Sequence, residues 1–330
     1  MPNVITHGLM AQDVRSQLET PHVKQAIESY KRAYFLGCNG PDIFFYYNQW
    51  PWKDQIEAKR VHEIGNRIHQ DSINAFYESW VWAINNETTA ENKQILTAYL
   101  AGHLMHWSLD TIAHPYIFNQ SGDMSGATKY WHYRFESAID SKMVQEIKHL
   151  PLSSIHSSFF LHVSEKERAL ISRVYSTIVE ETYEVYCPPF ILEDTIKTGE
   201  QILRLMHDPK SWKVKVIGSL EKVVAEPWIF SSHVVFGEEE PYDVLNLKHR
   251  DWCHPADNTE ISAESFVDLY DRSITRGIEV LEHLDGAING QMDSYLDFIG
   301  EKSYDSGDNL HRPFIYYDSV YERGDFDGHH

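Results

Sequence analysis

The chain has 330 residues, 42% of them hydrophobic, a length and composition that fit one large or two small folded domains and exclude a disordered chain. An excess of acidic side chains gives a net charge of −20 at pH 7, which repels polyanions and makes nucleic acid an unlikely partner. Three widely spaced cysteines form no CxxC pair, so the sequence indicates neither a disulfide framework nor a thiolate metal site.

Most of the chain repeats apolar residues with the period of an α-helix. This period runs through residues 21–36, 55–85, 91–113, 129–149, 164–186, 193–207 and 261–287. We expect the helix over 91–113 to end before Pro115, because proline disfavours the helical conformation of the residue before it. Strand-like alternation is rare and clearest at residues 212–217 (WKVKVI). The pattern therefore predicts an all-α fold of many helices.

Long irregular loops separate some of these helices. Residues 37–54 are rich in turn formers and aromatic side chains, and residues 209–257 contain an acidic run at Glu238–Glu240. The chain opens without the basic and then apolar segment of a secretory signal, and no apolar run reaches the ~18 residues of a transmembrane helix. We therefore expect a cytoplasmic protein without a transmembrane segment, and nothing in the pattern indicates its oligomeric state.

The segment GHLMHWSLDTIAHPY (residues 102–116) carries His106, Asp110 and His114 at intervals of four. Four residues are slightly more than one helical turn, so the three side chains project from nearly one face. Imidazole and carboxylate groups in this arrangement are typical ligands of a divalent metal ion. A second pair with the same spacing, His132 and Glu136, follows in WHYRFESAID. Two such clusters so close together predict a polynuclear metal site and hydrolytic chemistry.

The apolar surroundings of Asp110 favour a metal over a simple surface pair. An unpaired carboxylate buried among leucine and isoleucine side chains would be costly, and the nearest arginine, Arg134, lies in another segment. Nitrogen and oxygen ligands without thiolates suit zinc, manganese or iron. His7, Asp42 and either His62 or His69 are further candidate ligands, whereas His103 fits a core histidine better.

The order of these motifs resembles the zinc-dependent phospholipase C family of bacteria, which has S1/P1-type nucleases as distant relatives. The motifs are THGLM with His7, GPDIFFY with Asp42, NRIHQD with His69, AGHLMHWSLDTIAHPY, and HYRFE with His132 and Glu136. They extend from about residue 5 to about residue 150. The order His, Asp, His, His-x3-Asp, His, His-x3-Glu is specific to the family's metal site.

The resemblance implies a helical phospholipase C/P1 nuclease-like bundle in which metal-bound water attacks a phosphodiester. It implies one zinc at Asp42, His69, His106 and Asp110, a second at His114, His132 and Glu136, and a third at His7, bridged to the first by Asp110. Asp42 would also orient the water or accept its proton. Secreted members cap the third zinc with an N-terminal tryptophan that the segment MPNVITHG lacks, so we expect two or three ions.

On this resemblance we expect residues 1–208 to form a metal-binding helical core and residues 209–330 a mainly helical extension packed on it. The aromatic loop at residues 44–52 follows Asp42 directly and should line the rim of the cleft, either as a ligand-contacting surface or as a hydrophobic plug.

The leading hypothesis for function is a zinc-dependent, phospholipase C-like hydrolase that cleaves a small-molecule or lipid phosphoester. One alternative is a metal-dependent hydrolase or tailoring enzyme acting on an amide or ester of a small metabolite. The other is a non-catalytic scaffold, stabilised by metal, whose C-terminal part binds a partner. The sequence does not choose the substrate, because one fold and one metal site serve many reactions.

Overall fold

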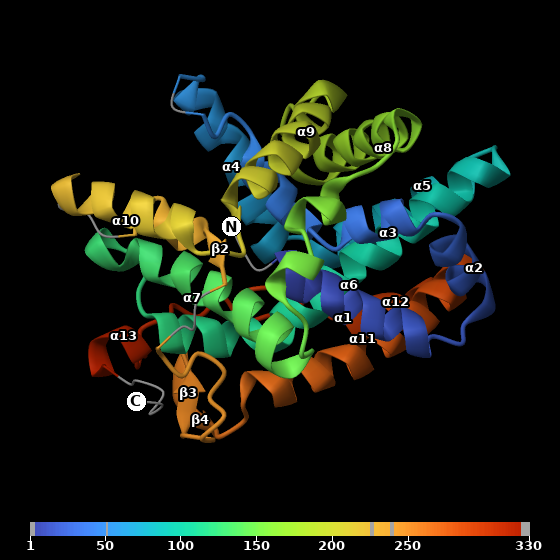
Figure 1. The fold of residues 1–330 in the computed structure, drawn as a ribbon. Coiled ribbons are helices and arrows are strands. Elements are labelled where there is room, and N and C mark those ends of the chain that lie inside the picture. Colours follow the sequence, from blue (N-terminus) through green and yellow to red (C-terminus); the bar gives the residue numbers. More distant parts are fainter. Residues whose placement is uncertain (1–3, 51, 225–227, 238–240, 325–330) are drawn as a thin grey trace.

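The computed structural model describes residues 4–50, 52–224, 228–237 and 241–324, and its architecture is drawn in Figure 1. Helices dominate these ranges, and β-structure within them is confined to two small two-stranded sheets, so the predicted all-α class is confirmed. None of the described helices is both long and apolar enough to cross a membrane. The acidic run Glu238–Glu240 lies outside the described residues.

The helices of the first two thirds of the chain are numbered in order. They are α1 (Val4–Gln17), α2 (Pro21–Ser29), α3 (Lys31–Gly37), η1 (Gly40–Tyr46), α4 (Gln55–Gln70), α5 (Ile73–Asn86), α6 (Ala90–Ser121), η2 (Gly126–Thr128), α7 (Lys129–Lys142), η3 (Met143–Ile147), η4 (Leu152–Ser154), η5 (Ser157–Leu161), α8 (Glu165–Tyr183) and α9 (Pro189–Met206).

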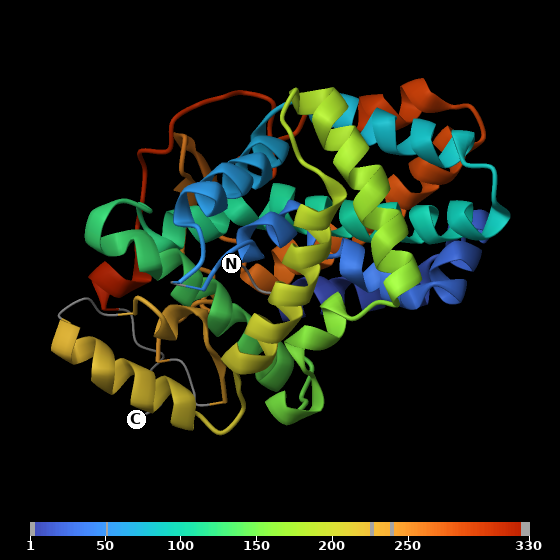
Figure 2. The ribbon, with the colours of Figure 1, turned by 90° about the horizontal axis from the view of Figure 1, so that it is seen from above.

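The last third combines short strands with further helices. Its elements are β1 (His207–Asp208), α10 (Trp212–Val224), η6 (Ser231–His233), β2 (Val235–Phe236), β3 (Trp252–His254), β4 (Asp257–Ser262), α11 (Phe266–Ile288), α12 (Met292–Ile299) and α13 (Val320–Arg323). Strand β1 pairs parallel with β2, and β3 pairs antiparallel with β4. Figure 2 shows the irregular segment between α12 and α13 returning across the molecule.

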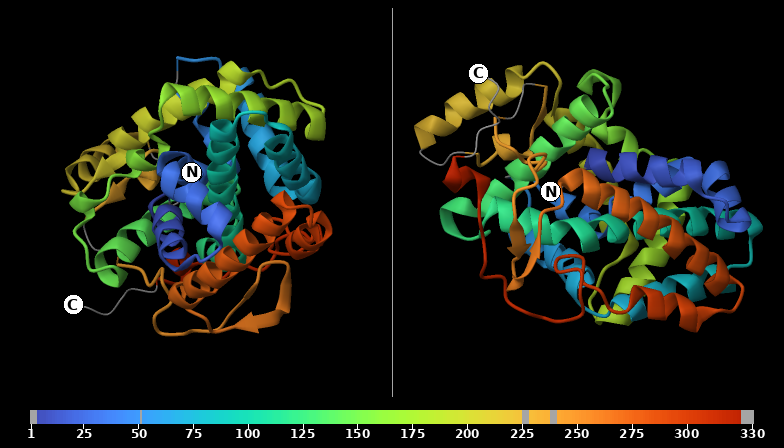
Figure 3. Two further views of the ribbon diagram at one scale, coloured as in Figure 1. Left: turned by 90° about the vertical axis from the view of Figure 1, so that its right-hand side faces the viewer. Right: turned by 90° about the horizontal axis from the view of Figure 1, so that it is seen from below.

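The long helix α6 forms the centre of the bundle. Every residue from Ile95 to Ile117 is buried, as expected of a helix that is covered on all sides. Helices α3 and α11 pack along α6 most extensively, and the left view of Figure 3 shows α6 between the pair α8 and α9 and the pair α11 and α12. The polar residues of α6 therefore lie in the interior, where water cannot solvate them.

Two predicted helices are each split in two. The run at residues 21–36 forms α2 and α3, which are separated at Tyr30. The run at residues 55–85 forms α4 and α5, and the chain turns between them at Asp71 and Ser72. Ser72 adopts a left-handed conformation with φ 55°, which ends one helical period and starts another.

The prediction that the central helix ends before Pro115 is wrong, because α6 continues to Ser121. Proline removes the N–H that would bond the carbonyl of Thr111. Gly307 packs directly against that carbonyl: a Cβ placed on Gly307 would lie 2.1 Å from the Thr111 oxygen. Tertiary packing around α6 therefore holds the helix together through the proline.

The strand predicted at residues 212–217 is also wrong, because these residues form the first half of α10. The buried carboxylate of Asp208 accepts a hydrogen bond from the N–H of Val214 at 2.9 Å, which satisfies a donor of the first helical turn. Six alternating residues are too few to distinguish a strand from a short amphipathic helix.

The C-terminal helices pack on the N-terminal half rather than apart from it. Helix α11 contacts α6 and α1, and α12 contacts α5 and α11. On these contacts we propose that residues 209–330 fold as an extension of the 1–208 core.

Candidate metal centre

Three groups of buried histidine and carboxylate side chains meet beside the middle of α6. The His7 group contains His7, His106 and Asp110; the Asp42 group contains Asp42, His69 and His106; and the Glu136 group contains His114, His132 and Glu136. Within each group, one potential ligand atom per residue lies within 4.8 Å of the others. The structure thus brings together all eight residues that the sequence singled out as ligands.

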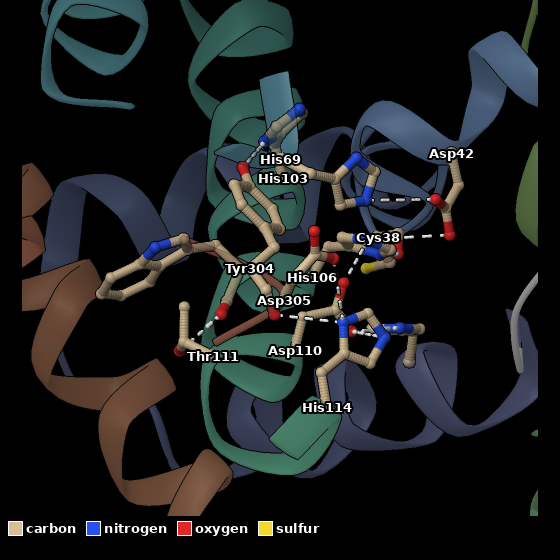
Figure 4. A network of polar contacts seen from close by, with 12 residues as sticks. Cys38, Asp42, His69, His103, His106, Asp110, Thr111, His114, Tyr304 and Asp305 are labelled. Atoms are coloured by element: carbon tan, nitrogen blue, oxygen red, sulfur yellow. Dashed lines mark hydrogen bonds and ion pairs between the residues drawn. The ribbon is translucent and has the colours of Figure 1, made fainter. Parts of the chain in front are cut away.

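Five separate elements deliver these residues. Helix α1 supplies His7, η1 supplies Asp42, α4 supplies His69, α6 supplies His106, Asp110 and His114, and α7 supplies His132 and Glu136. Figure 4 shows the residues of η1, α4 and α6 converging around Asp110, with Tyr304 and Asp305 beside them.

Asp110 and His106 connect the groups to one another. Asp110 Oδ2 lies 2.8 Å from His106 Nε2, and Asp110 Oδ1 lies 3.2 Å from His7 Nε2 and 3.4 Å from His114 Nε2. His106 Nε2 is also 3.7 Å from Asp42 Oδ2. The Asp110 carboxylate is therefore surrounded by three imidazoles that together represent all three groups, which is the geometry of a bridging ligand.

The Glu136 group is built on one turn of α7 and one residue of α6. Glu136 Oε1 lies 3.1 Å from His132 Nε2 and 3.6 Å from His114 Nε2. Burial alone would raise the pKa of the Glu136 carboxyl, but the adjacent His132 and His114 hold that pKa well below its usual range. Glu136 is therefore an anion at neutral pH although it is buried.

Four of the histidines are oriented by hydrogen bonds on the side that faces away from the centre. Their Nδ1 atoms contact Gly65 O at 2.7 Å for His69, Cys38 O at 3.0 Å for His106, Tyr304 O at 3.0 Å for His114, and Ser121 Oγ at 3.3 Å for His132. A carbonyl can only accept, so Nδ1 of His69, His106 and His114 carries a proton, and Nε2 is the nitrogen that faces the centre and can bind a metal ion.

The atoms that face the centre are buried without hydrogen-bond partners among the described residues. They are His7 Nδ1 and Nε2, Asp42 Oδ2, His106 Nε2, Asp110 Oδ2, and Glu136 Oε1 and Oε2. Each unsatisfied buried polar group costs about 1–3 kcal/mol, so a cluster of them is stable only if something else binds it. Nitrogen and carboxylate oxygen donors without thiolates suit zinc, manganese or iron, so the residues present fit metal ions.

The charge of the site also favours a cation. Burial lowers the pKa of His69, but Asp42, Asp305 and Asp110 outweigh it and raise that pKa to about 9. Burial likewise opposes the charging of His114, yet Asp110, Glu136 and Asp305 raise its pKa to about 10. These carboxylates keep His69 and His114 in the positively charged form when no other cation is present. A divalent ion can replace the extra proton of each ring.

Two candidates considered from the sequence have other roles. His103 is fully buried and contacts the hydroxyls of Tyr77 and Tyr175, each at 3.1 Å. Burial lowers the pKa of His103 well below its usual value, so it is a neutral core residue. His62 Nε2 lies 3.2 Å from the carbonyl of Tyr47, whereas His69 points to Asp42 at 3.3 Å.

Sequence reasoning missed the C-terminal strap, which we define as residues 303–307. Its Tyr304 carbonyl accepts the His114 Nδ1–H, and its Tyr304 N–H donates to the carbonyl of His69 at 2.9 Å. Asp305 Oδ2 accepts from Gln70 Nε2 at 2.9 Å, and Asp305 Oδ1 lies 3.9 Å from His114 Nδ1. The strap thus touches residues of two metal groups, and no local spacing in the sequence indicates this.

A cavity of about 1200 Å³ opens onto the centre. Asp42, His69, His114, His132 and Glu136 line it, together with Asp305 of the strap. Aromatic and aliphatic side chains line most of the rest, among them Phe45, Trp50, Trp52, Phe118, Tyr133, Phe230, Leu310, Phe314 and Tyr317. The aromatic loop therefore borders the cavity as expected, although its Pro51 lies outside the described residues.

Comparison with known proteins identifies the family. A family model described as zinc dependent phospholipase C matches residues 6–187, which is more than half of the chain and includes all eight predicted ligands. No curated protein and no solved structure matches the chain. Fold and matched region agree with the resemblance inferred from the motifs, and the chain belongs to the zinc-dependent phospholipase C family.

Proposed function

We propose that this protein is a zinc-dependent phosphoester hydrolase of the phospholipase C type. The observation that carries the proposal is the set of buried, unsatisfied nitrogen and oxygen atoms beside a large cavity that Asp42 and Glu136 of this set also line. Family membership supports zinc as the metal and phosphoester hydrolysis as the reaction.

The proposed ligand sets combine the three groups with the metal order of the family motifs, in which Asp110 is shared between two ions. Asp42, His69, His106 and Asp110 would hold one ion, His114, His132 and Glu136 a second, and His7 with Asp110 a third. Metal ions in such a site lower the pKa of water and stabilise the negative charge that develops on a phosphoryl group. Two or three ions are compatible with these residues.

Asp42 is the proposed catalytic carboxylate. Its Oδ1 lies 3.3 Å from His69 Nε2, while its Oδ2 lacks a hydrogen-bond partner among the described residues. Asp42 also lines the cavity, so this oxygen can orient an attacking water and accept its proton. The hydrogen bond from His69 Nδ1 to Gly65 fixes the ring that orients Asp42.

A lipid phosphoester is the substrate class that the cavity supports best. Trp52, Phe230 and Leu310 line the cavity and are 75%, 54% and 55% exposed, so apolar side chains surround its opening. Arg312 also lines the cavity, but its guanidinium already pairs with Asp257 and Asp308. Apolar walls with few available cations fit a substrate whose alkyl part is larger than its charge.

The test is hydrolysis by zinc-replete protein of a chromogenic phosphomonoester, a phosphodiester, a choline phosphoester and a carboxyl ester. We expect phosphodiester or choline phosphoester cleavage, and Asp42→Asn should lower kcat by about 10²–10⁴-fold. Asp54→Asn is the matched control, because Asp54 is an exposed carboxylate of the following segment whose side chain caps the start of α4.

Two other outcomes would replace the proposal. Cleavage of the carboxyl ester alone would favour a hydrolase of small metabolites. Zinc binding that raises the melting temperature without hydrolysis of any ester would favour a metal-stabilised scaffold. Absence of metal from carefully purified protein, even after zinc loading, would refute the metal centre itself.

A further inference from the structure

The first turn of α1 is held by a carboxylate from another helix. Asp140 Oδ1 accepts the N–H of Thr6 at 2.8 Å and its hydroxyl at 2.7 Å, and Asp140 Oδ2 accepts the N–H of Ile5 at 3.1 Å. N–H groups of a first helical turn have no partner within their own helix, and a carboxylate is a strong acceptor for them. Asp140 is 1% exposed, so water does not compete for these bonds.

The next residue of α1 is His7, the one predicted histidine ligand whose ring lacks an orienting hydrogen bond. Both of its ring nitrogens are buried without hydrogen-bond partners among the described residues. Its ring stacks on His106 with centroids 4.1 Å apart, and its Nε2 lies 3.2 Å from Asp110 Oδ1. The position of His7 therefore depends mainly on the backbone that carries it.

Asp140 lies on the same face of α7 as two metal-group residues. His132, Glu136 and Asp140 follow one another at intervals of four, so the helix directs all three to one side. One helix thus supplies two residues of the Glu136 group and also fixes the start of the helix that carries His7. Asp140 itself does not line the cavity.

We propose that Asp140 is a positioning residue of the metal centre: by fixing the first turn of α1, it holds His7 against Asp110 and His106 and supports the ion bound there. This inference rests on the proposed metal centre but not on the identity of the substrate. Asp140 belongs to none of the three ligand groups and does not line the cavity.

The test is a zinc titration of the metal-free full-length protein, with the stoichiometry and the affinity of each binding step as readouts. Asp140→Asn keeps the shape of the side chain but replaces one accepting oxygen with an NH₂ group, which cannot accept from Ile5 or Thr6. We expect one ion to bind about 10–100-fold more weakly, the usual effect of losing an outer-shell partner, while the remaining ions bind unchanged.

Three variants make the result specific. Ser141→Ala is the matched control: Ser141 is buried on α7 beside Asp140, but its hydroxyl bonds Phe236 O at 2.9 Å and not α1, so all ions should bind normally. Thr6→Val removes one of the three bonds to Asp140 and should weaken the same ion to a smaller degree. In a His7→Ala background, Asp140→Asn should cause no further loss.

Wild-type affinity for every ion in Asp140→Asn would overturn the inference, and so would an equal loss for all ions, which would mean a general structural role. If Asp140→Asn does not fold, Thr6→Val decides in the same way, because unchanged zinc binding in that variant contradicts the proposed anchor. Failure of the metal centre as a whole is distinguishable, since the wild-type protein would then bind no zinc.

Discussion

Gly40 brings the backbone of η1 directly against the His106 ring, and replacing it by alanine should damage both stability and metal binding. Its backbone has φ +50°, and a Cβ built there would lie 2.3 Å from His106 Cδ2 and 2.5 Å from His106 Cγ. Ordinary van der Waals contact begins near 3.4 Å, so His106 or η1 with Asp42 must move by about 1 Å.

The expected loss of folding stability in Gly40→Ala combines two costs. A left-handed conformation costs an alanine about 1–2 kcal/mol, and overpacking of a dense interior adds about 1–3 kcal/mol. We therefore expect Gly40→Ala to lower the free energy of unfolding by about 2–5 kcal/mol. Metal ligands must be held within about 0.5 Å of their working geometry, so a shift of this size should also abolish tight zinc binding at the Asp42 group.

Gly126→Ala separates the two costs, because Gly126 has φ +57° but no atom within 4 Å of a built Cβ. Urea unfolding of the metal-free proteins should show only the conformational cost in Gly126→Ala, and zinc titration should show its normal affinity. The reasoning is refuted if Gly40→Ala matches Gly126→Ala in both measurements, because the contact with His106 would then have no consequence.

Three further predictions concern the strap, the charge of the site and the cavity opening. Gly307→Ala would place a Cβ 2.1 Å from the Thr111 oxygen, which should displace the strap from His114. The affinity of the Glu136 group for zinc should then fall, and unchanged zinc affinity in a titration would contradict this. Because the pKa values of His69 and His114 are raised to about 9 and about 10, both rings are protonated on both nitrogens, and therefore positively charged, at pH 7 in the metal-free protein. Zinc binding should release these protons and strengthen as pH rises toward 9, which calorimetry in buffers of different ionisation enthalpy will detect; binding without proton release would disprove it. Trp52→Ala should slow hydrolysis of a long-chain phosphoester in vesicles but not of a short soluble one, and equal slowing of both would argue against an apolar substrate surface.

Local geometry explains what could be predicted about the site from sequence. A four-residue interval puts side chains on one face of any α-helix, so the alignment of His106, Asp110 and His114, and of His132 with Glu136, follows from the period alone. The all-α class follows from the same period. His7, Asp42 and His69 come from separate elements, and only the order of the family motifs indicated that they belong with the others.

Tertiary packing determined the parts of the metal centre and of the fold that local spacing does not predict. Asp110 lies between three imidazoles because α1 packs against α6 and brings His7 to the carboxylate, and no spacing along the chain encodes that contact. Tyr304 orients His114 across 190 positions of sequence. Helix boundaries depended on packing as well, since α6 continues through Pro115 to Ser121 while Gly307 packs against the carbonyl of Thr111. Local periodicity determined which side chains share a face, whereas contacts between distant segments determined which faces meet.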